Sequence, residues 1–361
     1  MKLKKLTTAL ILGSTLFGGI AMANQSATVI EVPAQTIQLT QTWDKVFPKS
    51  DKVEHRKVTF KNRFGITLAA DVYMPKNATG KLPAIAVAGA FGAVKEQISG
   101  LYAQHLAERG FITVAFDPSY TGESSGLPRN TASPEINTED FSAAVDFLGI
   151  LENVDREKIG ILGICGWGGF ALNAAIADPR IKAVATSTMY DMTRVMANGY
   201  NDSVDNNARM EMRKAVNNAR WVSAQHDYAD VGEPDKHLTP QDQITADTPQ
   251  FVKEYSDYYK TERGFHTRSV NSNSAWSTVM TASFINMPIL QRADELRTPA
   301  LIVHGENAHS RYFSEDAFKA LGSQDKELYI VKGATHVDLY DDKAGKIPYD
   351  KFEEFFKAKL N

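Results

Sequence analysis

The chain contains a single cysteine, Cys165, and the residues around it are small. It stands in the stretch Gly163-Ile164-Cys165-Gly166-Trp167-Gly168-Gly169, after an apolar run at 158–162 and before an alanine-rich segment at 170–177. These two segments predict a buried strand and a helix. A turn of small residues between a strand and a helix is typical of a nucleophile elbow, and the N–H groups at the start of the helix favour a thiolate. We therefore predict that Cys165 is a nucleophile rather than a cysteine that only packs in the core.

A thiol nucleophile needs a base, and His336 is the strongest candidate. It lies in the loop after the last predicted strand, at 326–331. The loops that leave the carboxyl ends of parallel strands converge on one edge of the sheet, so His336 can approach Cys165. His304 ends the preceding strand and His309 lies in the loop after it, so either could bind the substrate.

The segments that must position these residues alternate between strands and helices. Segments 57–60 and 65–75 predict an antiparallel edge. Apolar runs at 83–89, 111–116, 158–162, 181–186, 298–304 and 326–331 predict further strands, and helices are predicted at 98–109, 141–151, 170–177 and 349–360. This pattern predicts an α/β protein with a mostly parallel sheet and helices on both faces.

The alternation stops between residues 189 and 297. This segment is polar, rich in aromatic residues and predicted to be helical. An insertion at the carboxyl edge of the sheet would cover the active site as a cap and shape an apolar, partly aromatic pocket. Tyr190, at the start of the insertion, is a candidate substrate-binding residue.

With these features the chain resembles the α/β-hydrolase superfamily, and within it the dienelactone-hydrolase-like group with a cysteine nucleophile. The resemblance rests on the elbow, on the stretch Asp117-Pro118-Ser119-Tyr120-Thr121-Gly122-Glu123-Ser124-Ser125-Gly126 and on the His336 loop. It implies an α/β-hydrolase fold with a helical cap insertion, and an order along the chain of nucleophile, acid and histidine. The implied acid is Glu306, near the expected position at Ala308, or Asp191 after the preceding strand.

The same resemblance implies an oxyanion hole made of two backbone N–H groups. One belongs to Gly166 and the other to Ala90 or Phe91, in the loop after the strand at 83–89. Two departures from the family pattern stand out. Trp167 occupies a position where the elbow usually has glycine, so its bulky side chain must point away from the elbow or reshape it; Trp167 is also a second candidate substrate-binding residue. Ala90 stands where dienelactone hydrolases carry a glutamate.

The two ends of the chain and its composition predict the compartment and exclude several partners. Lys2, Lys4 and Lys5, an apolar run at 6–20 and Ala21-Met22-Ala23 predict a cleaved signal peptide at 1–23 and a periplasmic or secreted protein without stable membrane association. An N-terminal arm at 24–55, a core at 56–188 and 298–361, and the cap at 189–297 are expected to follow. The net charge of -3 gives no indication of nucleic-acid binding. No phosphate-binding glycine loop or zinc-ligand spacing is present, so we expect no cofactor and no metal.

These features predict an exported hydrolase that cleaves an ester, thioester or lactone through an acyl-cysteine intermediate. The expected substrate is a small molecule with an apolar or aromatic acyl group. Two alternatives stay open: an acyl transferase on the same fold, and a non-catalytic binding protein that retains the fold.

Overall fold

A mixed sheet of eight strands forms the centre of the computed structural model, which describes residues 36–76 and 78–360. The strands are β1 (Val53–Lys61), β2 (Thr67–Pro75), β3 (Leu82–Ala88), β4 (Ile112–Phe116), β5 (Val154–Ile164), β6 (Ala183–Ser187), β7 (Ala300–Gly305) and β8 (Lys326–Val331). Their spatial order is β1-β2-β4-β3-β5-β6-β7-β8. β1 pairs with β2 and β2 with β4 in antiparallel fashion, and the remaining neighbours are parallel. The predicted fold class, with its antiparallel edge, is confirmed.

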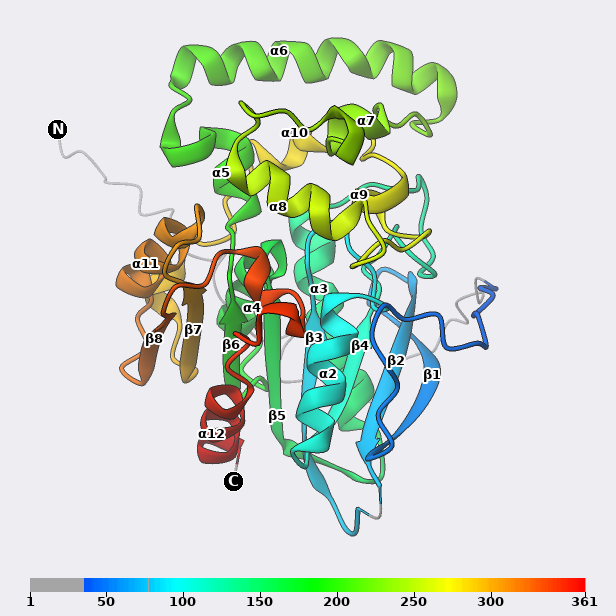
Figure 1. Ribbon diagram of the computed structural model, residues 1–361, viewed down its shortest axis with the longest axis vertical. Coiled ribbons are helices and arrows are strands. Elements are labelled where there is room, and N and C mark those ends of the chain that lie inside the picture. Colours follow the sequence, from blue (N-terminus) through cyan, green and yellow to red (C-terminus); the bar gives the residue numbers. More distant parts are fainter. Residues whose placement is uncertain (1–35, 77, 361) are drawn as a thin grey trace, which may run out of the picture. The chain divides into compact units, whose positions relative to one another are not determined.

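Helices cover both faces of the sheet (Figure 1). α2 (Ile98–Glu108) and α12 (Tyr349–Leu360) pack on one face, and α3 (Pro134–Gly149), α4 (Gly166–Ala177) and α11 (Arg311–Ala320) pack on the other. Alternate residues of one strand contribute to the two cores: Ile161 faces α3 and α4, whereas Leu162 faces α2 and α12. This alternation is the period of two expected of a strand buried on both faces.

Two helices begin earlier than the sequence predicts. α3 starts at Pro134 rather than at residue 141, because Ser133 caps it by accepting a hydrogen bond from the Ile136 N–H and proline suits the first turn. α4 starts at Gly166 rather than at residue 170. The turn before it is tight: a Cβ on Gly163 would lie 2.2 Å from the carbonyl oxygen of Trp167, so glycine is required there.

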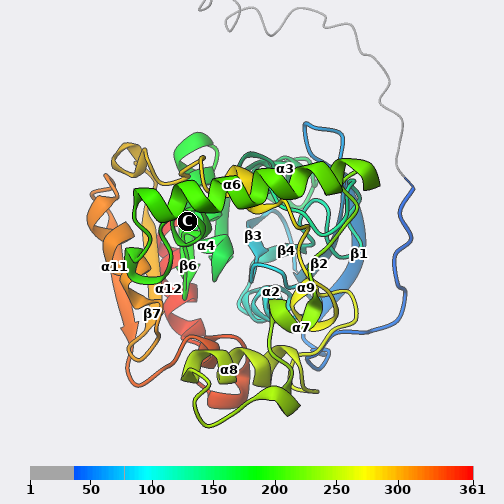
Figure 2. The ribbon, with the colours of Figure 1, turned by 90° about the horizontal axis from the view of Figure 1, so that it is seen from above.

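The segment between β6 and β7 forms the cap (Figure 1). Its helices are α5 (Met192–Asn198), α6 (Asn206–Ser223), α7 (Pro234–His237), α8 (Gln250–Tyr259), α9 (Val270–Asn273) and α10 (Thr281–Phe284). They lie beyond the carboxyl ends of the parallel strands, and α6 runs across the top of the sheet (Figure 2).

Short 3-10 turns occur at Tyr200–Asp202, Ala224–His226, Gln241–Gln243, Ala293–Glu295, Val337–Leu339 and Asp342–Ala344.

The N-terminal predictions are only partly within the described chain. The predicted signal peptide at 1–23 lies outside the described residues, as do positions 24–35 of the predicted arm. Residues 36–52 contain no helix or strand, and β1 begins at Val53, two residues before the predicted end of that arm at residue 55. None of the helices in the described ranges is long and apolar enough to cross a membrane.

Candidate active site

Cys165 occupies a strained turn between β5 and α4. Its φ of 53° and ψ of -128° place it in the left-handed half of backbone space, which a residue with a side chain rarely adopts. Neighbouring strands hold the turn: the Cys165 N–H donates to Ser187 O at 2.9 Å, and the Tyr190 N–H donates to Cys165 O at 2.8 Å. A Cβ on Gly166 would lie 2.6 Å from Phe91 Cβ, so the next residue must be small. The strand, turn and helix therefore have the arrangement of a nucleophile elbow.

Two backbone N–H groups point at the thiol. The N–H groups of Gly166 and Phe91 hydrogen-bond the Cys165 side chain. These two donors are suitably placed for an oxyanion hole, with Phe91 rather than Ala90 as the second contributor. Ala90 instead accepts a hydrogen bond at its carbonyl from the Ala93 N–H at 2.9 Å.

Cys165 carries a thiol at rest, not the thiolate expected from its position at a helix N-terminus. Cys165 is only 7% exposed, and this burial raises the pKa of its thiol more than hydrogen bonds from Tyr340, Gly166 and Phe91 lower it. A base must therefore remove the proton when substrate is bound.

The hydroxyl of Tyr340 lies between the nucleophile and the imidazole. It is 3.1 Å from His336 Nε2 and also hydrogen-bonds the Cys165 thiol. His336 and Cys165 thus lie at the same sheet edge, but no direct hydrogen bond between them occurs in the described part of the chain. Tyr340 was not predicted as a site residue from the sequence. Its position four residues after His336 was the feature that could have indicated it.

Hydroxyl groups, not a carboxylate, contact the other nitrogen of His336. Its Nδ1 is 2.6 Å from Ser310 Oγ and 2.8 Å from Thr188 Oγ1. His336 is fully buried, and this burial, together with the nearby His309 and His304, holds its pKa well below the ordinary histidine value. The imidazole is therefore neutral at rest.

The two predicted triad acids have other partners, which corrects the prediction that either would orient His336. Glu306 is exposed, and its Oε2 accepts a hydrogen bond from the Gly333 N–H at 2.7 Å. Asp191 is the N-cap of α5 and accepts a hydrogen bond from the Arg194 N–H at 3.0 Å. Within residues 36–76 and 78–360, neither carboxylate hydrogen-bonds or forms an ion pair with His336.

Trp167 is a core residue, which corrects its prediction as a substrate contact. Its side chain is 1% exposed and packs against three aromatic rings on the α3 and α4 side of the sheet. The ring centroids lie 5.7 Å from Phe116, 5.6 Å from Phe141 and 5.2 Å from Phe170. The side chain thus points away from the thiol.

Tyr190 remains beside the reacting groups. Its ring centroid is 5.3 Å from that of His336, and its hydroxyl hydrogen-bonds His309 Nε2. Tyr255 of α8 lies at the same centroid distance of 5.3 Å from His336. Rings from the cap and from the β6–α5 connection therefore flank the imidazole.

The cap also holds the loop that carries the second oxyanion donor. Asn271 of α9 donates its backbone N–H to Gly92 O at 3.1 Å and its side-chain amide to Phe91 O at 2.8 Å. Gly92 has a φ of 85°, and a Cβ there would lie 2.3 Å from Asn271 Oδ1, so glycine is needed for this close approach. Displacement of the cap would therefore move the Phe91 N–H relative to the Cys165 thiol.

A buried charge cluster anchors the cap and the N-terminal segment to the core. The three carboxylate partners of Lys95 Nζ are Glu96 at 2.7 Å, Asp117 at 2.8 Å and Glu123 at 2.6 Å. Arg268 of the cap lies 2.9 Å from Glu96 and 2.7 Å from Asp44, which precedes β1. These ion pairs link the cap and the segment before β1 to the loops that follow β3 and β4.

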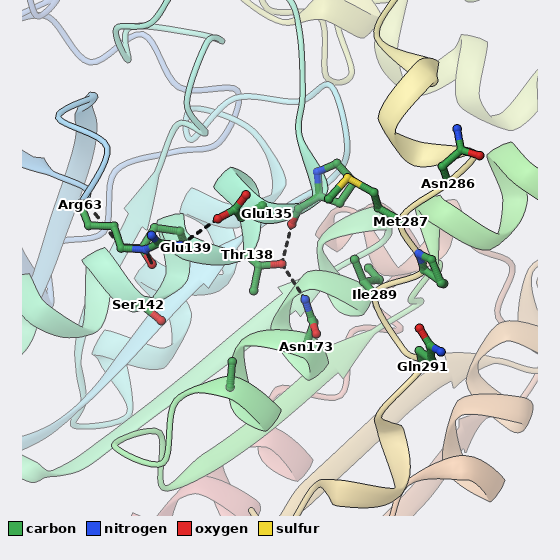
Figure 3. Close-up of a pocket in the computed structure, with 13 residues that line it drawn as sticks. Arg63, Glu135, Thr138, Glu139, Ser142, Asn173, Asn286, Met287, Ile289 and Gln291 are labelled. Carbon is green, nitrogen blue, oxygen red and sulfur yellow. Dashed lines mark hydrogen bonds and ion pairs between the residues drawn. The ribbon is translucent and has the colours of Figure 1, made fainter. Parts of the chain in front are cut away.

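Cys165 and His336 do not line the five cavities described for this structure. Figure 3 shows a cavity of about 530 Å³ beside α3 and α4, and another of about 680 Å³ lies next to α5. Five cavities of about 370–710 Å³ lined by described residues include neither Cys165 nor His336 in their walls.

The described residues also contain no group of three or more His, Cys, Asp or Glu side chains suited to hold a metal ion.

Comparison with known proteins gives strong matches across most of the chain. The model of the X-Pro dipeptidyl-peptidase (S15) family matches residues 65–338. Protein PA2218 of Pseudomonas aeruginosa is 58% identical over 326 residues, which cover 90% of this chain and 86% of that protein. Its crystal structure superposes with a TM-score of 0.86 over 90% of this chain and all of the other.

Other matches are more distant. The α/β hydrolase GrgF of Penicillium sp. sh18 shares the fold, with a TM-score of 0.67 and 22% identity over 85% of this chain and 99% of the other. Two fungal proteins match over 135 residues, 37% of this chain. The thiohydrolase aneE of Aspergillus aculeatus is 33% identical over 42% of its own length, and the acyltransferase drtE of Aspergillus calidoustus is 30% identical over 43%.

Proposed function

Because this chain belongs to the X-Pro dipeptidyl-peptidase (S15) family of α/β-hydrolases, we propose that it is a hydrolase that cleaves an ester, thioester or lactone through an acyl-cysteine intermediate. The observation that carries the proposal is the environment of Cys165. Its thiol stands at a strained elbow, faces the N–H groups of Gly166 and Phe91, and shares the Tyr340 hydroxyl with His336. A dienelactone-hydrolase-like reaction with cysteine as nucleophile fits this arrangement.

The proposed reaction begins with transfer of the thiol proton. When the substrate binds, the Tyr340 O–H turns from the thiol toward His336 Nε2. The S–H proton then passes to the Tyr340 oxygen while the Tyr340 O–H proton passes to His336 Nε2, which leaves a thiolate, a neutral tyrosine and an imidazolium. Sγ then attacks the carbonyl carbon, and the oxyanion is held by the two N–H donors. One such donor contributes roughly a hundredfold to a thousandfold in kcat in other enzymes.

The leaving group then takes the proton from His336 as the tetrahedral intermediate collapses. Water enters, gives its proton to the same nitrogen and attacks the acyl-cysteine carbonyl. The second tetrahedral intermediate releases the acid and restores the thiol. Each proton taken by His336 is returned, so the cycle closes without a cofactor.

Thioesters are attractive substrates because one relative is named a thiohydrolase. Acyl transfer to another acceptor is the second candidate. The closed site around Cys165, 7% exposed, favours it, because a cap that limits water also lengthens the life of the acyl-cysteine, and a second relative is named an acyltransferase. Rings of Phe91, Tyr190 and Tyr255 beside the reacting groups favour an apolar or aromatic acyl part.

We further propose that the protein works in the periplasm or outside the cell, because residues 1–23 have the pattern of a signal peptide. Fractionation of cells that express the full chain, with sequencing of the mature N-terminus, tests this. A mature chain that begins near residue 24 in the periplasmic or secreted fraction is expected, and an intact N-terminus in the cytoplasm would contradict it.

The enzymatic proposal is tested with Cys165→Ala and a panel of acyl substrates. The panel contains p-nitrophenyl esters, an N-acetylcysteamine thioester, a lactone and an X-Pro p-nitroanilide, with and without an added alcohol or amine acceptor. Rapid quenching followed by mass spectrometry should show an acyl adduct on Cys165 of the wild type. Cys165→Ala should lose turnover with little change in thermal stability.

Ser99→Ala is the matched control, because Ser99 is buried and its hydroxyl has no hydrogen-bond partner among the described residues. It should keep wild-type turnover. Turnover by Cys165→Ala, or cleavage of the X-Pro amide alone, would overturn the proposal. An acyl product on the added acceptor in place of free acid would instead favour the transferase.

A further inference from the structure

A chain of hydroxyl and imidazole groups extends from His336 into the protein, where a triad would have a carboxylate. Ser310 Oγ is 2.6 Å from His336 Nδ1 and 2.9 Å from His304 Nε2. On the far side of its ring, His304 Nδ1 is 2.6 Å from Ser314 Oγ. All four residues are fully buried. The contacts are short and shielded from water, so each hydrogen must have a defined place.

Donor counting restricts where those hydrogens can be. A serine hydroxyl has one hydrogen, yet Ser310 Oγ contacts an imidazole nitrogen on each side. At least one of these two nitrogens must therefore carry a proton. Burial lowers the pKa of His304 to about 3, so each imidazole is neutral and holds a single N–H.

Two arrangements satisfy this count and also give the Ser310 hydrogen one of these two nitrogens as its acceptor. In the first, His336 Nδ1–H donates to Ser310, Ser310 O–H donates to His304 Nε2, and His304 Nδ1–H donates to Ser314. In the second, every donor is reversed, and the proton of His336 sits on Nε2. Only the first leaves a lone pair on Nε2, facing the Tyr340 hydroxyl at 3.1 Å.

We propose that Ser310 and His304 are positioning residues that hold His336 with its proton on Nδ1, in the place that a triad carboxylate would fill. This inference rests on the proposed function, because only the thiol chemistry requires a free Nε2. Thr188, 2.8 Å from Nδ1, is a second acceptor for the same N–H. A carboxylate fixes a histidine tautomer by its charge. The hydrogen-bonded groups of Ser310, His304 and Ser314 instead fix it by the direction in which each group donates.

The tautomer can be measured directly. In protein labelled with ¹⁵N-histidine, nitrogen chemical shifts and couplings to the ring carbon-bound protons distinguish an Nδ1–H from an Nε2–H imidazole. We expect the wild-type His336 to be the Nδ1–H form, and Ser310→Ala with Thr188→Val to shift it toward Nε2–H. This readout does not depend on any substrate.

Enzyme kinetics provide a second, independent test of the proposal. Ser310→Ala should lower kcat by about tenfold or more with little change in KM, because the fraction of His336 able to accept a proton falls. In a His336→Gln background the same change should have no further effect. Ser323→Ala, a buried serine whose hydroxyl donates to Asp325 O at 3.2 Å, is the matched control and should change neither readout.

Four outcomes decide between these possibilities. An Nε2–H wild-type His336, or an equal effect of Ser310→Ala with and without His336, would overturn the inference. Turnover that survives Cys165→Ala would refute the proposed function but not alter the tautomer result. Loss of the Nδ1–H form in Ser310→Ala with Thr188→Val, together with loss of kcat in Ser310→Ala, would support it.

Discussion

The neutral histidines buried beside the nucleophile should make the fold sensitive to acid. Burial, with smaller effects from His309 and Arg311, lowers the pKa of His304 from 6.5 to about 3. The folded protein then binds fewer protons than the unfolded chain between these two values. Stability is therefore complete above about pH 6.5 and is lost progressively as the pH falls toward 3.

The size of this effect follows from linkage. At pH 5 the unfolded His304 is almost fully protonated and the folded one is not, so this residue alone costs about 2 kcal/mol relative to pH 7. His336, whose pKa is also held well below 6.5, acts in the same direction. Replacement of His304 with glutamine keeps a side chain that can hydrogen-bond but removes the group that binds a proton in this pH range.

Urea unfolding of the wild type and of His304→Gln between pH 5 and 7 measures the effect. The wild type should lose about 2 kcal/mol more than the variant over this range. His226→Gln, a change at an exposed histidine in the cap, is the control and should follow the wild type. Equal pH dependence in wild type and His304→Gln would refute the assignment of a neutral buried His304.

Three further predictions follow from the same contacts. Tyr340→Phe removes the hydroxyl at His336 Nε2 and should lower the acylation rate by about tenfold or more, seen in the pre-steady-state burst; an unchanged burst would exclude the tyrosine relay. Glu306→Gln should keep more than half of wild-type kcat, because the carboxylate contacts a backbone N–H away from the imidazole; a hundredfold loss would restore it as the triad acid. Arg268→Gln should lower the free energy of unfolding by about 2 kcal/mol in urea melts, because buried Glu96 loses a partner 2.9 Å away; no change would mean that the neighbouring lysines suffice.

Local patterns were enough to predict most of the fold. Continuous apolar runs marked the central strands, because a strand buried on both faces has no polar side to interrupt it. The elbow was predictable because the strand, the tight turn and the helix follow one another directly. The start of α3 was missed because its first turns bury polar residues: Asp140 is fully buried and hydrogen-bonds Asn62 and Ser119, which no apolar period reveals.

The catalytic surroundings were less predictable, because they come from elements far apart in the chain. Trp167 is two residues from Cys165, which suggested contact with the substrate. The turn at the elbow instead sends the two side chains to opposite faces of the sheet, with Trp167 in the core under α3 and α4 and Cys165 in the core under α2 and α12. The partners of His336 come from β6–α5, β7–α11 and the last loop, and no spacing in the sequence links them.

The burial of Cys165 has a consequence for every rate measured on this protein. If a substrate or alkylating reagent reaches this thiol, which is 7% exposed, only after the cap opens, each observed rate is the intrinsic rate multiplied by the open fraction. If one molecule in about a hundred is open, the apparent reactivity is about a hundredfold below that of a free site. Contacts that hold the cap and lie away from the thiol, such as Arg268 with Glu96, then set an opening equilibrium. Weakening them by about 1.4 kcal/mol would raise the open population tenfold. A cap variant far from the thiol can thus be faster than the wild type while being less stable.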